Sequence, residues 1–141
     1  VENALPVARA LGVECPKVAV LSAVENVTDK MPSTVTAREI AERGVEGCVI
    51  SGPLALDGAI SRESVKHKAI KDPVAGQADI LLVPFIEIGN VLYKACSYIA
   101  GKTMASTICG ASCPVIITSR ADTPDSKYYS ILMAVLRCLK A

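Results

Sequence analysis

Residues 78–94 (ADILLVPFIEIGNVLYK) constrain the fold of this chain most, because they have the pattern of a buried strand followed directly by an amphipathic helix. Residues 80–83 form an apolar run of strand length without polar alternation, which is typical of a parallel strand buried on both faces. Pro84 ends this run. Beyond it, apolar residues recur at helical spacing and predict a helix packed against the sheet: Ile88, Leu92, Cys96 and Ile99.

The turn between this strand and this helix is a candidate ligand site. In open parallel sheets, ligands bind in the crevice beyond the carboxyl ends of the strands. Glu87, Gly89 and Asn90 would stand at that end, and Lys94 follows one helical turn after Asn90. A solvated helix face would also explain Asn90 and Lys94, so their spacing alone does not assign them a function.

The rest of the sequence alternates between strand and helix patterns. Apolar runs predict four further strands, at residues 17–22, 48–50, 105–109 and 114–118. Helical signals predict a helix ending before Gly12, a second from the capping box of Thr36 and Glu39 to Gly44, and a third from Ser61 to about residue 70. Residues 23–35 are rich in turn formers and predict a loop. This order predicts an α/β fold with a mostly parallel sheet and right-handed crossovers.

Composition narrows the class of protein further. Of the 141 residues 51% are hydrophobic and only 4% aromatic, so the core must be aliphatic, as in layered α/β proteins. A net charge of +1 gives no electrostatic case for nucleic acid or an anionic membrane. Most of the six cysteines lie in apolar segments, which predicts reduced thiols and a cytoplasmic location. A single histidine and the lack of a CxxC pair argue against a metal site.

Residues 118–127 (TSRADTPDSK) carry a second functional signal. A predicted strand ends in Ser119 and Arg120, and Thr123 with Pro124 has the pattern of a helix start. A hydroxyl, a guanidinium and the free N–H groups of a helix start together favour an anion site. The alternative from the residues alone is a surface arginine that pairs with Asp122 or Asp125. An apolar stripe then continues to the C-terminus: Tyr129, Leu132, Met133, Leu136 and Leu139.

These motifs resemble the phosphate acetyltransferase and phosphate butyryltransferase family, whose members carry a pattern like ADILLVPxIExGNxLYK. The SRADxxxSK form of the second motif is more similar to the butyryl branch. Two positions depart from the family pattern. Phe85 stands where members usually have an acidic residue, and Ser126 stands where the acetyl branch has a catalytic aspartate.

The resemblance implies functional residues at the matching positions. Arg120 would hold phosphate or an acyl phosphate, and Ser119 would assist the transition state. Asn90, Lys94, Gly89, Asp57 and Ser126 would bind substrate, although Asp57, which closes the family-like segment SGPLALD, is equally explained as a turn former. The resemblance implies that coenzyme A is a substrate and that no cofactor is bound. A homodimer is implied as well.

The resemblance also implies an architecture, the three-layer α/β/α fold of the isocitrate and isopropylmalate dehydrogenase type. Residues 1–110 would form most of the family's second domain, and residues 111–141 the strand and helix that return to the first. The chain begins at Val1 rather than Met, and members are about twice as long, so we expect an N-terminal half to be missing. The returning segment would then dock on residues 1–110, swap into another chain, or be loosely held.

The function predicted on this basis is exchange of a short-chain acyl group, butyryl first, between coenzyme A and inorganic phosphate. The 141 residues alone are expected to be inactive or nearly so. One alternative is a non-catalytic oligomerisation or ligand-sensing domain, which the residues Phe85 and Ser126 favour. Another is a metal- and nicotinamide-dependent decarboxylating dehydrogenase, but the sequence lacks the clustered carboxylates that this chemistry needs.

Overall fold

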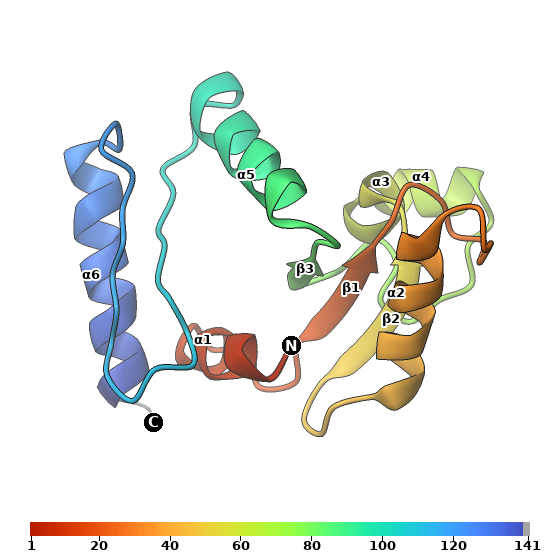
Figure 1. Ribbon diagram of the computed structural model, residues 1–141, viewed down its shortest axis with the longest axis horizontal. Coiled ribbons are helices and arrows are strands. Elements are labelled where there is room, and N and C mark those ends of the chain that lie inside the picture. Colours follow the sequence, from red (N-terminus) through yellow and green to blue (C-terminus); the bar gives the residue numbers. More distant parts are fainter. Residues whose placement is uncertain (140–141) are drawn as a thin grey trace.

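The computed structural model describes residues 1–139 of the chain. Its sheet contains β1 (Lys17–Leu21), β2 (Val49–Leu54) and β3 (Ile80–Leu82), in the order β2-β1-β3 with both pairs parallel. The three strands are the first three that the sequence predicts, and the parallel α/β arrangement is confirmed (Figure 1). β2 is longer than predicted, because Leu54 still pairs with Leu21 beyond an irregularity in the register.

The core lies around β1, which is the central strand. Four of its five residues are buried, as expected for an apolar strand covered on both faces. On one face, Ala19 and Leu21 pack with α3 (Leu56–Ile60), the loop at Val74 and residues of α4 (Arg62–His67). Helix α2 (Pro32–Arg43) packs on β2 and β1 from the other side. Helices on both faces of the sheet give the predicted three layers.

The helix ends follow local sequence signals with one exception. The first helix comprises η1 (Glu2–Ala4) and α1 (Leu5–Ala10), and Gly12 follows it with a φ of 92°. Ser61 caps α4 as predicted, its hydroxyl accepting the Ser64 N–H at 3.2 Å. The capping box predicted at Thr36 is wrong, because α2 begins at Pro32. Proline is favoured in the first turn of a helix, so Pro32 begins α2 here although residues 23–35 were predicted to form a loop.

Two expectations about residues 80–99 are wrong within the described chain. β3 is only half-buried, because it lies at the edge of the sheet. The helix formed by α5 (Ile86–Lys94) and the π-helical turn η2 (Ala95–Ile99) projects away from the sheet and has no buried residue (Figure 1). Ile88 is 45% exposed and Ile99 is 87% exposed. The apolar stripe was identified correctly, but none of its residues is buried against the sheet.

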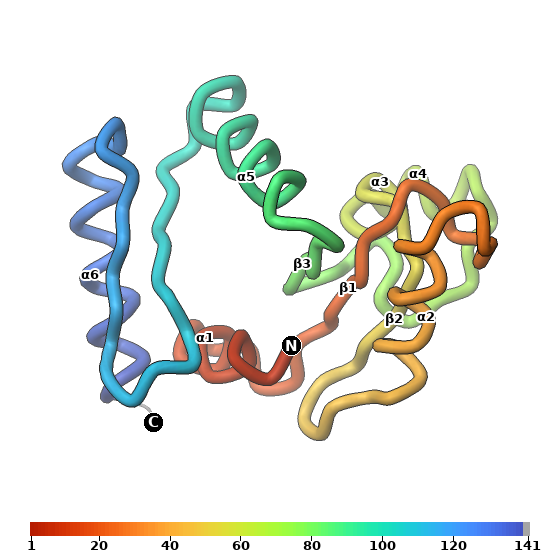
Figure 2. Tube along the Cα trace, in the orientation of Figure 1, coloured from red at the N-terminus to blue at the C-terminus, as the bar shows by residue number. Residues whose placement is uncertain are grey.

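The strands predicted at residues 105–109 and 114–118 are not part of the sheet. They contact each other through an antiparallel bridge between Ile108 and Val115 and through side-chain hydrogen bonds from Ser106 and Thr107. Both segments run beside α6 (Pro124–Leu139), as the trace in Figure 2 shows. These two segments lie too far from the sheet β2-β1-β3 to join it as further strands. Without neighbouring strands to supply ladder hydrogen bonds, their β-branched residues form extended segments only.

Helix α6 docks on its own chain rather than extending freely. It contacts α1, and two serines on its buried face bond the backbone of the preceding segment. Ser126 Oγ accepts the Met104 N–H at 3.3 Å, and Ser130 Oγ accepts the Ser106 N–H at 2.9 Å. The predicted apolar stripe of α6 is mostly exposed, with Leu139 at 77%. Residues 103–118 therefore group with α6, while the predicted domain boundary at 110/111 stays a prediction.

No helix among residues 1–139 has both the length and the apolar character needed to cross a membrane.

Candidate active site

A closed turn immediately before α6 carries the two residues predicted to be catalytic. The Asp122 N–H donates to the Ser119 carbonyl oxygen at 3.1 Å, which closes the turn through its backbone. The Ser119 N–H donates to Asp122 Oδ2 at 2.7 Å, which closes it a second time through a side chain. Ser119 and Arg120 therefore sit in a turn whose two ends are bonded to each other.

Helix α5 reaches this turn with two adjacent side chains. Lys94 Nζ lies 3.4 Å from Ser119 Oγ, and the Tyr93 hydroxyl donates to Asp122 Oδ1 at 3.0 Å. Burial and then the Asp122 carboxylate raise the pKa of Tyr93 above its ordinary value, so the hydroxyl stays protonated and able to donate near neutral pH. The tertiary structure thus brings together Lys94 and Ser119, two predicted site residues from separate motifs.

The hydroxyl of Ser119 is arranged to donate its proton to a further group. Its oxygen is contacted by Lys94 Nζ and by the Ala121 N–H, each at 3.4 Å. An ammonium and a backbone N–H can only donate, so Ser119 Oγ accepts in both contacts. Its own hydrogen is used in neither contact and can point to an incoming acceptor.

Arg120 is exposed and makes no hydrogen bond or ion pair with any of residues 1–139. The surface pair with Asp122 that the sequence left open does not form. Asp122 instead uses its two carboxylate oxygens for Tyr93 and for the backbone of Ser119. The guanidinium therefore keeps its donors and its charge available, at a position next to Ser119.

The start of α6 follows directly and has the predicted cap. Thr123 Oγ1 accepts the Ser126 N–H at 3.2 Å, and Pro124 is the first helical residue. Ser126 itself is only 5% exposed, and its hydroxyl oxygen also accepts a bond from Thr123 Oγ1. This placement favours a structural role for Ser126, since its side chain is used in joining α6 to the preceding segment.

Two further predicted residues lie on α5, on the same helix as Lys94. Asn90 is exposed one turn before Lys94 and shares its side of the helix. Gly89 packs near the end of β3, where an added Cβ would lie 3.2 Å from Val83 Cγ2. Close packing of α5 against Val83 is thus a sufficient reason for a glycine there.

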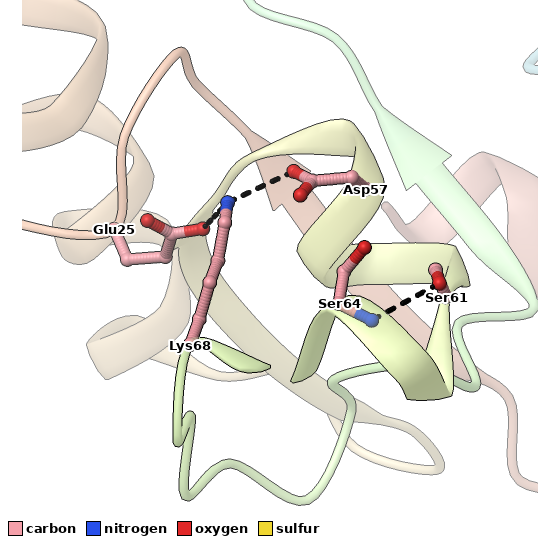
Figure 3. Close-up of polar contacts among 5 residues, drawn as sticks. All are labelled: Glu25, Asp57, Ser61, Ser64 and Lys68. Atoms are coloured by element: carbon pink, nitrogen blue, oxygen red, sulfur yellow. Dashed lines mark hydrogen bonds and ion pairs between the residues drawn. The ribbon is translucent and has the colours of Figure 1, made fainter. Parts of the chain in front are cut away.

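Asp57 is not part of this group. It lies on α3, at the side of the molecule opposite α6 (Figure 1). There Lys68 Nζ bridges Asp57 Oδ1 at 3.0 Å and Glu25 Oε1 at 2.9 Å (Figure 3). The bond from Lys68 lowers the pKa of Asp57, and the bonds to Glu25 and Asp57 raise the pKa of Lys68. Within the described residues Asp57 has a local partner and is remote from Ser119.

An apolar cavity of about 490 Å³ lies at the carboxyl ends of β1 and β3, where the sequence predicted a crevice. Phe85, which departs from the family pattern, is 61% exposed and forms part of its wall. The other lining residues are Leu21, Ser22, Ala23, Ser33, Leu56, Pro84, Ile88, Val91, Leu92 and Ala95. Ser119 and Arg120 are not among them, so the predicted crevice and the turn before α6 are separate features.

Sequence reasoning missed Tyr93 as a site residue and treated Asp122 only as a neighbour of the motif. The available signal was that Tyr93 directly precedes Lys94. Consecutive helical residues point in different directions, and only Lys94 had been assigned a ligand, which left the contact of Tyr93 unexplained. For Asp122, the signal was its spacing after Ser119, because an acid three residues further on can close a turn. Neither signal shows that Tyr93 and Asp122 are partners, because these two residues are 29 positions apart in the sequence.

A parallel α/β fold with a hydroxyl, an ammonium and an unpaired guanidinium at a helix start has the features of an anion-binding protein. A family profile described as "Phosphate acetyl/butaryl transferase" matches residues 1–135. The chain is 46% identical over 140 residues to the phosphate acetyltransferase of Thermotoga maritima, covering 96% of this chain and 48% of that protein. It is 49% identical over 138 residues to the probable phosphate butyryltransferase of Bacillus subtilis, covering 95% and 46%. The chain belongs to this family of transferases.

Solved structures agree with this assignment. A branched-chain phosphotransacylase from Enterococcus faecalis matches with a TM-score of 0.92 at 43% identity, over 100% of this chain and 52% of that chain. A phosphotransacetylase from Streptococcus pyogenes matches with a TM-score of 0.80 at 25% identity, over 99% and 43%. The chain spans about half the length of the curated relatives it matches.

Proposed function

We propose that the full-length protein carrying these residues is a phosphate acyltransferase. It exchanges a short-chain acyl group, with butyryl as the first candidate, between coenzyme A and inorganic phosphate. Family membership supports the reaction class, since the relatives named above are phosphate acetyl- and butyryltransferases. The turn before α6 supports the location of the phosphate site.

The observation that carries this proposal is that Arg120, the residue after Ser119, has no ionic or hydrogen-bond partner among residues 1–139, while the Ser119 hydroxyl is free to donate. A guanidinium can bind two phosphate oxygens at once through a planar fork of N–H donors. These donors are not available to phosphate when a carboxylate is already bound to them. Lys94 adds a second positive charge 3.4 Å from Ser119 Oγ. A cation and a hydroxyl donor from the turn, with a second cation from α5, suit a dianionic reactant better than a neutral one.

The chemistry needs no covalent enzyme intermediate. An oxygen of hydrogen phosphate attacks the thioester carbonyl carbon, the new carbon–oxygen bond forms, and the carbon–sulfur bond breaks to release the coenzyme thiolate. The proton that the phosphate carried passes through water to that thiolate, which leaves acyl phosphate and coenzyme A. Arg120 and Lys94 hold the phosphate in position for attack. Ser119 donates its hydrogen bond to the oxygen of the carbonyl as negative charge develops there.

The experiment that tests this proposal measures release of coenzyme A from butyryl-coenzyme A and phosphate by the full-length protein. Arg120→Ala is expected to lower turnover by about 10²-fold or more, because phosphate is then no longer held in position for attack. Arg38→Ala, an exposed arginine on α2 at the other side of the molecule, serves as the matched control and is expected to behave as wild type.

Unchanged activity in Arg120→Ala would contradict the site assignment. Phosphate binding without turnover by the wild type would favour the non-catalytic alternative. Residues 1–141 by themselves are expected to turn over slowly, because the relatives that carry the activity in their names are about twice as long.

The proposal includes coenzyme A as a substrate, with no resident cofactor, a homodimer and a cytoplasmic location. Exposed apolar residues along α5 support an oligomer, because a run of apolar side chains such as Ile86, 81% exposed, and Val91, 69% exposed, indicates a contact surface. Six free thiols fit a reducing compartment. The mass of the full-length protein in solution measures the oligomeric state.

A further inference from the structure

The Asp122 carboxylate connects two parts of the candidate active site, helix α5 and the turn before α6. One oxygen accepts the Tyr93 hydroxyl of α5 at 3.0 Å, and the other accepts the Ser119 N–H at 2.7 Å. Both are hydrogen bonds to a charged acceptor, which are about twice as strong as those between neutral groups. The carboxylate is thus held on the α5 side of the turn by a donor from another element.

Arg120 lies two residues before Asp122, within reach of a carboxylate that is free to rotate. An exposed pair of this kind would contribute up to about 1 kcal/mol. In this structure the pair does not form within residues 1–139, and the bonds from Tyr93 and from the Ser119 N–H orient the Asp122 carboxylate instead. The Tyr93 bond therefore has a consequence for Arg120, which Tyr93 does not itself contact.

We propose that Tyr93 and Asp122 are a positioning pair for the phosphate site: the Tyr93 hydroxyl retains the Asp122 carboxylate and so keeps it from neutralising Arg120. This inference rests on the proposed function, in which Arg120 binds phosphate. It assigns Tyr93 a role in phosphate affinity rather than in the acyl transfer step. Burial and the Asp122 charge raise the pKa of Tyr93, which keeps its hydroxyl a donor under assay conditions.

Removing the Tyr93 hydroxyl releases Asp122 Oδ1, which can then compete with phosphate for Arg120, while Oδ2 keeps its bond from the Ser119 N–H. In Tyr93→Phe, the KM for phosphate is expected to rise roughly fivefold, the factor that corresponds to an exposed ion pair of about 1 kcal/mol. The KM for butyryl-coenzyme A and kcat at saturating phosphate are expected to stay within about twofold, because saturating phosphate displaces the competing carboxylate.

A second substitution separates this mechanism from a general loss of packing. In the double variant Tyr93→Phe/Asp122→Asn, the neutral amide retains an oxygen that can accept the Ser119 N–H but cannot pair ionically with Arg120. The KM for phosphate is expected to return to near the wild-type value. A purely structural defect from losing Tyr93 would not be repaired by a further substitution in the same contact.

The control is Tyr128→Phe, which removes an exposed hydroxyl from the second turn of α6, close in sequence to the same motif. It is expected to match wild type. An unchanged KM for phosphate in Tyr93→Phe, with Arg120→Ala strongly impaired, would overturn this inference and leave the proposed function intact. A lower kcat together with an equal rise in both KM values, without rescue by Asp122→Asn, would also overturn it. Failure of the wild type both to turn over and to bind inorganic phosphate in calorimetry would overturn the proposed function and this inference together.

Discussion

Gly52 lies where the sheet and α2 approach each other closely, and replacing it tests the packing of this fold. It lies in β2, between the neighbouring strand β1 and the backbone of α2. A Cβ added there would lie 2.8 Å from Val20 Cβ, 3.0 Å from the Val20 carbonyl oxygen and 3.2 Å from the Ala37 carbonyl oxygen. The substitution Gly52→Ala is therefore sterically forbidden without movement of the backbone.

The size of the effect follows from the nature of these neighbours. Two carbon atoms attract most at about 3.5 to 4.0 Å, so a 2.8 Å contact with Val20 Cβ is strongly repulsive. Two of the three close atoms are backbone oxygens, which cannot rotate away as the end of a side chain can. Overpacking of a core costs about 1 to 3 kcal/mol, and we expect Gly52→Ala near the upper end of that range.

The assay is urea unfolding of the full-length protein, followed by circular dichroism, with Gly58→Ala as the matched control. At Gly58 an added Cβ would meet only the movable ends of Glu25, at 3.1 Å, and Ile70, at 3.2 Å. Gly58 also lies in α3, where alanine is favoured over glycine by about 0.5 to 1 kcal/mol, so this variant should be close to neutral. If Gly52→Ala unfolds within about 0.5 kcal/mol of wild type, the close approach of β2 to α2 described above is incorrect.

Ser130→Ala should lower the free energy of unfolding by about 1 to 3 kcal/mol, because Ser130 is 1% exposed and its loss leaves the Ser106 N–H without an acceptor. Faster hydrogen exchange at the Ser106 amide would confirm the cause, and unchanged exchange would contradict it. Lys68→Gln should destabilise the protein at pH 7 relative to Lys66→Gln, an exposed control on α4. The deficit should shrink as the pH falls through the lowered pKa of Asp57, below its ordinary 3.8, and as it rises through the raised pKa of Lys68, above its ordinary 10.5. A deficit that is constant from pH 2 to pH 12 in urea titrations would refute this assignment.

Much of the local structure could be predicted from the sequence, because it depends on residues near one another in the chain. The run at residues 80–83, the cap at Thr123 and the stop at Gly44 each produced the expected element. The candidate phosphate site could be predicted in part for the same reason. Ser119 and Arg120 are adjacent, and a helix start follows within a few residues.

Other features could not be predicted, because they depend on which surfaces meet. An apolar stripe on α5 shows that one side of the helix is apolar, but it does not say what covers that side. Residues 105–109 have the composition of a strand, yet a strand also needs a neighbour, and the sheet of this chain does not reach them. Asp57 closes a family-like segment, but its partner is Lys68 rather than a residue near Ser119.

The sequence by itself indicated the parallel α/β class through its apolar and capping patterns, and the family through the resemblance of its two motifs; it also singled out Ser119–Arg120 as a candidate anion site. Only the tertiary structure decided that Arg120 has no ionic partner among residues 1–139, that Lys94 contacts Ser119 and that Tyr93 holds Asp122. The physical reason is that a charged side chain acts on whatever group lies within a few ångströms. That neighbour is set by how α5 and α6 are placed by the rest of the chain, not by the order of residues around either helix.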